Sequence, residues 1–142
     1  MLPQIIIASI CIIITIYGVF KKNRFFFNLG YFIYGLIVIF SEINFYLDNQ
    51  ESIHLAVATL FLIQTMLVFP NKINYDGSKL AKSAAIKIYC SLVFINVFGA
   101  YIVLSSEVPD FVSYFHILLA VLPLISVYLI LNNKIEITKI KL

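Results

Sequence analysis

The sequence contains few charged residues. Only 12% of its 142 residues are Asp, Glu, Lys or Arg, whereas 62% are hydrophobic, and the mean hydropathy is +1.01. A soluble domain carries roughly a quarter of its residues as charged side chains. This scarcity argues against a water-soluble enzyme and a disordered chain, and it predicts an all-α integral membrane protein.

The sequence also lacks the residues that most small catalytic or metal-binding domains need. It has no tryptophan and two cysteines, Cys11 and Cys90, both within expected membrane spans. Two such cysteines support neither a disulfide framework nor a metal cluster. We find no glycine-rich phosphate loop, no His-Glu-x-x-His and no Gly-x-Ser-x-Gly motif. No catalytic residue and no cofactor are therefore predicted.

Long apolar stretches fill most of the chain. A transmembrane helix needs about 20 mainly apolar residues to cross a hydrocarbon core of about 30 Å. The connections between the apolar stretches are too short to fold into a further domain. We therefore expect residues 1–142 to form a single transmembrane domain, a bundle of five helices at approximately 2–20, 25–47, 53–69, 83–104 and 111–131.

The basic residues are sorted to one side of these expected spans. All ten Lys and Arg flank the same side, and the other side carries Asp48, Glu51, Glu107 and Asp110. Positive charges near spans are retained in the cytoplasm. This predicts an N-terminus outside and a cytoplasmic C-terminus. A net charge of +3 that is divided in this way gives no basic patch, so no nucleic-acid partner is expected.

Ionisable side chains inside the bilayer are the first candidates for function, because they are costly to place there. Glu42 and His116 are both expected roughly 8 Å below the outer surface, at 1.5 Å per residue, and His54 begins the third span on that side. Ser41, Ser113 and Ser106 can close a hydrogen-bonded cluster around these three residues. The expected polar intramembrane cluster therefore comprises Ser41, Glu42, His54, Ser113 and His116, with Ser106 as a further neighbour.

Three interpretations of this cluster remain open from the sequence. The simplest is a structural pair between Glu42 and a histidine or serine in the bundle interior. A second is a proton relay that opens to the outer face, because carboxylates and imidazoles carry protons in pumps and transporters. A third makes His54 and His116 ligands of a metal or haem, which requires their rings to converge from different helices.

Uncharged polar residues within the spans are expected to hold helices together. Amide side chains hydrogen-bond across membrane helices and contribute about 0.6–2 kcal/mol each. Basic residues near the cytoplasmic ends of spans are expected to reach the inner-leaflet headgroups. The amide residues are Asn28, Asn44, Gln64 and Asn96, and the expected lipid contacts are Lys79, Lys82 and Lys87.

The sequence predicts a small accessory or scaffold subunit that packs against other membrane proteins or copies of itself. Residues 74–78 and the tail at 134–142 are the candidate partner contacts. A small transporter or proton-conducting protein built on Glu42, His54 and His116 is the alternative, and a His-ligated redox or metal-binding subunit is a second one. The composition fits a bacterial cytoplasmic membrane, with an organellar membrane as the other location.

Overall fold

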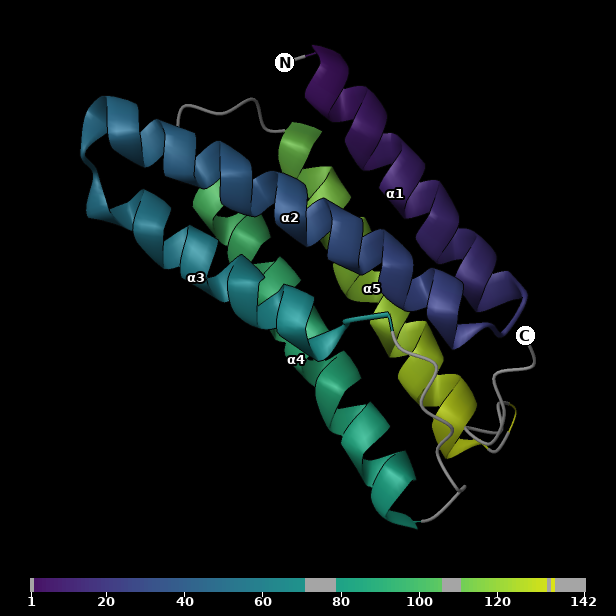
Figure 1. Cartoon of the computed structure of the whole chain (residues 1–142). Coiled ribbons are helices and arrows are strands. Elements are labelled where there is room, and N and C mark those ends of the chain that lie inside the picture. Colours follow the sequence, from purple (N-terminus) through teal and green to yellow (C-terminus); the bar gives the residue numbers. More distant parts are fainter. Residues whose placement is uncertain (1, 71–78, 106–110, 133, 135–142) are drawn as a thin grey trace.

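The part of the chain that the structure describes is entirely helical between its turns. The computed structural model describes residues 2–70, 79–105, 111–132 and 134. It confirms the predicted all-α class. The helices, shown in Figure 1, are α1 (Leu2–Phe20), α2 (Arg24–Asn49), α3 (Ser52–Leu67), α4 (Lys79–Leu104) and α5 (Phe111–Leu131).

Three of the five expected spans have the length and composition to cross a membrane, namely α2, α4 and α5. Helix α3 and the stretch of α1 from Ile5 to Phe20 are also apolar, but each is shorter than the 18 residues expected of a span. The expected span 53–69 is too long, since α3 has 16 residues and measures about 24 Å at 1.5 Å per residue. A residue before proline disfavours helical geometry, so Pro70 explains why Phe69 is outside the helix. In contrast, α4 begins four residues before the predicted start at 83.

Short connections with specific backbone geometry join the first three helices. Asn23 caps α2, because its side chain accepts a hydrogen bond from the backbone N–H of Phe25 at 3.0 Å. At the other end of α2, Gln50 adopts a left-handed conformation with φ 58° and stops the helix. Only Gln50 and Glu51 separate α2 from α3. The two helices must therefore run antiparallel as close neighbours.

Helix α2 packs closely against both α1 and α3, and a glycine makes each contact possible. A Cβ atom on Gly30 would overlap the Thr15 hydroxyl of α1 and lie 2.5 Å from the Cys11 carbonyl oxygen. A Cβ atom on Gly35 would lie 2.6 Å from a methyl carbon of Thr65 in α3. Small residues let membrane helices approach in this way. The two glycines place α2 in the middle of a three-helix layer.

Aromatic side chains connect α2, the middle helix of this layer, to the α4–α5 hairpin. Figure 1 shows α4 and α5 crossing behind α2. Phe27 of α2 meets Tyr89 of α4 with ring centroids 5.1 Å apart. Tyr31 and Tyr34, one and two turns further along α2, reach α5. The interior between the two parts of the bundle is therefore rich in phenol groups.

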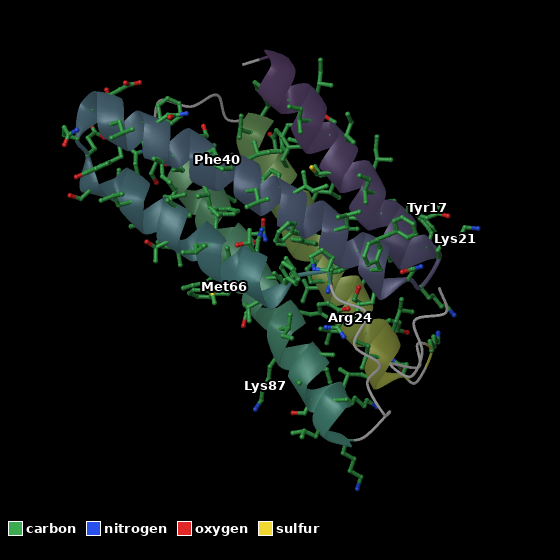
Figure 2. All side chains as sticks on the ribbon, viewed as in Figure 1. Tyr17, Lys21, Arg24, Phe40, Met66 and Lys87 are labelled. Atoms are coloured by element: carbon green, nitrogen blue, oxygen red, sulfur yellow. The ribbon has the colours of Figure 1, made fainter. Side chains whose placement is uncertain are left out.

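Large apolar side chains cover the outside of the described helices. Figure 2 shows Met66 of α3 pointing away from the bundle, and it is 72% exposed; Phe40 of α2 is 67% exposed. Similar residues lie on the outer faces of α1, α4 and α5. An apolar surface of this extent is unfavourable in water and is normal in contact with lipid tails. The structure thus supports residence in a membrane.

Candidate functional site

Glu42 and His54 form a pair near the turn between α2 and α3. The His54 Nδ1 atom lies 2.7 Å from Glu42 Oε2, and its Nε2 atom lies 3.7 Å from Glu51 Oε2. The His54 ring also stacks on Phe45, with centroids 5.5 Å apart. The side chains of both Glu42 and His54 retain about a fifth of their exposure. The pair therefore links α2 and α3 near their shared turn, at a site that is partly open to the surroundings of the bundle.

His116 has different partners from the ones that the sequence suggested. Its ring nitrogens lie 3.3 and 3.5 Å from the Tyr34 hydroxyl. Tyr34 precedes Glu42 by eight residues, which is about 12 Å along the axis of α2 at 1.5 Å per residue. The structure therefore brings Glu42 and His54 together and holds His116 in a separate, deeper environment.

The two serines of the expected cluster also divide. Ser113 lies one turn before His116 on α5. It is buried, and it interacts with a neighbouring group. Ser41 is only partly buried on α2. The further neighbour Ser106 lies outside the described residues.

Three helices surround the His116 ring of α5. Tyr34 of α2 and Phe61 of α3 pack against it with centroid distances of 5.8 and 5.9 Å. On the α4 side, Gly99 leaves room for the ring, because a Cβ atom there would lie 2.9 Å from His116 Nδ1. His116 is only 6% exposed. The imidazole is thus a packed core group that joins α2, α3, α4 and α5.

Gln64 and Asn96 form a second buried polar contact, between α3 and α4. Asn96 Nδ2 donates to Gln64 Oε1 at 3.0 Å, and both residues are fully buried. Along α4, Asn96 lies one turn before Gly99, which contacts His116. The structure therefore brings two of the four predicted amides together across a helix–helix contact.

A proline in α5 creates a third polar contact. Pro123 has no backbone N–H, so the carbonyl of Leu119, four residues earlier, lacks its usual helical donor. The Tyr31 hydroxyl of α2 donates a hydrogen bond to this carbonyl oxygen. A free carbonyl in a membrane interior is costly, and a donor from a neighbouring helix removes that cost. We call Tyr31, Tyr34, Gln64, Asn96 and His116 the central polar cluster.

The sequence interpretation missed both tyrosines of this cluster. Tyr31 and Tyr34 were not distinguished from the other aromatic residues, because an aromatic residue in a span usually has only apolar contacts or lies near the headgroups. Pro123 carried a usable signal, since a proline inside a helix predicts a carbonyl four residues earlier that needs a donor. Which helix supplies that donor depends on the tertiary packing.

The remaining amides and lysines take varied positions. Asn28 is 4% exposed, and its Oδ1 atom has no hydrogen-bond partner. Asn44 is exposed, so the structure does not place it between helices. Lys79 and Lys87 are exposed on α4 and Lys82 is partly buried; Figure 2 shows Lys87 pointing outward. An outward lysine within an apolar helix is positioned to reach headgroups with its flexible stem.

Among residues 2–70, 79–105, 111–132 and 134, the structure has no group of three or more His, Cys, Asp or Glu side chains that could hold a metal ion. His54 is in contact with Glu42, and His116 is in contact with Tyr34 and Phe61. Residues 74–78 and most of the tail at 134–142, the candidate partner contacts, lie outside the described residues.

Comparisons with known proteins give this chain no relative. No protein family, curated protein or solved structure matches it. The chemistry of the described side chains must therefore carry any functional conclusion.

We expect Gly99→Ala to displace His116. The added methyl group would lie 2.9 Å from the ring, which Tyr34 and Phe61 hold from the other side. Overpacking of this kind destabilises by about 1–3 kcal/mol. Unfolding in SDS mixed micelles measures the loss, and the ¹⁵N resonances of the two histidines report the displacement. Ser83→Ala, on the exposed face of the same helix, is the control. Unchanged His116 resonances in Gly99→Ala would contradict this contact.

Proposed function

We propose that all five helices span the membrane, with the N-terminus outside and the C-terminus in the cytoplasm. Lys22 Nζ donates to the Lys134 carbonyl oxygen at 3.0 Å, so the basic α1–α2 turn lies beside the end of α5. Asp48 and Glu51 lie at the opposite end of α2. The positive-inside rule assigns the basic end to the cytoplasm, which in a bacterium is the inner side of the cytoplasmic membrane.

Labelling from each side of the membrane tests this orientation. We expect Glu51→Cys to react with an impermeant thiol reagent from outside, and Lys21→Cys to react only after the membrane is opened. Both sites are exposed, and both variants are made in a Cys11→Ala/Cys90→Ala background. The reverse labelling pattern would invert the proposed topology.

Within this topology, we propose that the protein is a non-catalytic accessory or scaffold subunit that binds other membrane proteins or itself. The supporting observation is an aromatic stripe on the outer face of α4. Phe94 and Phe98 stack with parallel rings at 6.5 Å, and Phe98 stacks on Tyr101 at 6.4 Å. Phe94 and Tyr101 are 69% and 65% exposed. Rigid aromatic groups are typical anchors in protein interfaces.

Gentle extraction from the native membrane, followed by native mass spectrometry, tests the subunit proposal. We expect a stoichiometric assembly that is larger than the 16.2 kDa chain. Phe94→Ala/Phe98→Ala is expected to weaken that assembly, whereas Leu124→Ala/Ile125→Ala, on the exposed face of α5, is the matched control. A monomer at native abundance would argue against the proposal.

Proton conduction is the second candidate, and the Glu42–His54 contact of 2.7 Å favours it. A carboxylate and an imidazole at this distance can exchange a proton. The His116 ring of α5 lies against Tyr34, eight residues before Glu42 along α2. This candidate predicts proton flux into liposomes from the purified protein. Glu42→Gln and His116→Ala should each abolish the flux with folded yield retained. Equal flux in protein-free liposomes would exclude it.

A further inference from the structure

The hydrogen bonds of Asn96 fix the orientation of both amide groups in the Gln64–Asn96 contact. One amide donor and one amide acceptor are then left without a hydrogen-bond partner. Asn96 Nδ2 donates to two oxygens, Gln64 Oε1 at 3.0 Å and the Leu92 carbonyl at 2.9 Å. Turning the Asn96 amide around would direct its oxygen at the Leu92 carbonyl, where two acceptors repel. Asn96 must therefore present its nitrogen to Gln64, and Gln64 must present its oxygen in return.

The two remaining amide atoms are buried without a partner. Gln64 Nε2 and Asn96 Oδ1 have no hydrogen bond, and both residues have zero exposure. Each free atom is bonded to the same carbon as the atom that makes the interhelical hydrogen bond, so only two covalent bonds on each side of that hydrogen bond separate the two. In a membrane interior an unsatisfied donor and acceptor are each costly. The pair therefore provides complementary, unused hydrogen-bonding capacity at one place.

We propose that Gln64 and Asn96 form the binding site of a resident water molecule inside the bundle. Its oxygen accepts a hydrogen bond from Gln64 Nε2, and one of its hydrogens is donated to Asn96 Oδ1. Buried waters in proteins typically satisfy otherwise unpaired polar groups in this way. A single ligand that both donates and accepts is required, and water is the smallest one.

The surroundings restrict the ligand to this chemistry. Complete burial of both side chains excludes a protein segment or a lipid chain as the occupant. The pair itself carries no charge, so a bound ion would lack a compensating partner there. Gly99 lies one turn after Asn96 on α4, and the His116 ring of α5 packs against it, so the water lies beside the other members of the central polar cluster.

Water contact is measured directly on the Gln64 side chain. The chain contains only Gln4, Gln50 and Gln64, so selective ¹⁵N labelling of glutamine amides gives few signals. In lipid nanodiscs we expect nuclear Overhauser transfer of magnetisation from water protons to the Gln64 amide protons. The sign of this effect should be the one that a water molecule with a long residence time gives. Gln50, which is exposed, is the positive control, and the methyl groups of buried Ile130 on α5 are the dry control.

Two variants separate the bound water from a general leak of water into the bundle. Asn96→Leu removes the acceptor and should abolish the Gln64 transfer. Ser126→Ala, also buried but on α5, should leave it unchanged. If Asn96→Leu does not fold, the wild-type spectrum still decides. Absent transfer at Gln64 with normal transfer at Gln50 would overturn the proposal. Transfer from non-exchangeable protons would overturn it in favour of a bound solute.

Discussion

Tyr31→Phe is expected to lower the free energy of unfolding by about 1–3 kcal/mol, the usual cost of leaving a buried polar group unpaired. Phenylalanine keeps the ring and the packing of a residue with zero exposure, and it removes only the hydroxyl. The Leu119 carbonyl then loses the donor that replaces the absent N–H of Pro123. Reversible unfolding in SDS mixed micelles measures the change.

A second substitution shows whether the proline is the reason for this loss. Pro123→Ala restores a backbone N–H four residues after Leu119, and that N–H can bond the same carbonyl within α5. In the Pro123→Ala background, Tyr31→Phe should therefore destabilise the protein much less than in the wild type. Equal losses in the two backgrounds would contradict the compensation. Tyr101→Phe, at an exposed position of α4, controls for the removal of a hydroxyl.

Gly30→Ala is the second substitution with a large expected effect. Its methyl group would overlap the Thr15 hydroxyl and meet the Cys11 carbonyl oxygen at 2.5 Å and the Thr15 nitrogen at 3.0 Å. Two of these atoms belong to the backbone of α1, so side-chain rotation does not relieve the overlap. We expect α1 to move away from α2. The free energy of unfolding should fall by about 1–3 kcal/mol or more, even after alanine's higher helix propensity adds up to about 1 kcal/mol.

Gly35→Ala is the matched control for this prediction. It makes the same change on the same helix, but its closest atom is a Thr65 methyl carbon at 2.6 Å, which belongs to a side chain. We expect a smaller loss of stability than for Gly30→Ala, again measured by unfolding in mixed micelles. A larger loss for Gly35→Ala would show that the α1–α2 backbones are not the more tightly packed pair.

The Glu42–His54 pair and the buried His116 show how far sequence reasoning reaches toward the site. Glu42 and His54 flank a connection of two residues, so their contact at 2.7 Å follows from neighbouring helix ends. His116 belongs to a segment far away in sequence, and depth counted from its helix start did not identify Tyr34 as its partner. Counting residues along a helix gives a position on an axis. It does not give the rotation or the offset of that helix against another.

The helix ends show the same division. The start of α5 and both ends of α1 agree with the apolar pattern, because composition changes sharply there. The end of α3 was misplaced by two residues, since hydrophobicity continues through Phe69 while Pro70 disfavours the helix. The start of α4 came earlier than expected because the lysines at 79 and 82 are compatible with helix, although they are unfavourable in the apolar core of a membrane.

The sequence by itself determined that this chain is helical, that it is apolar enough for a membrane and that its basic residues gather at or next to alternate connections between apolar stretches and in the tail. These properties depend on composition and on residues near each other in the chain. Tertiary structure decided that Tyr31 donates to the Leu119 carbonyl, that Gln64 meets Asn96 and that the His116 ring of α5 packs against α2, α3 and α4. The reason is geometric, because each contact joins separate helices whose relative rotation depends on the packing of glycines and aromatic rings along their whole length.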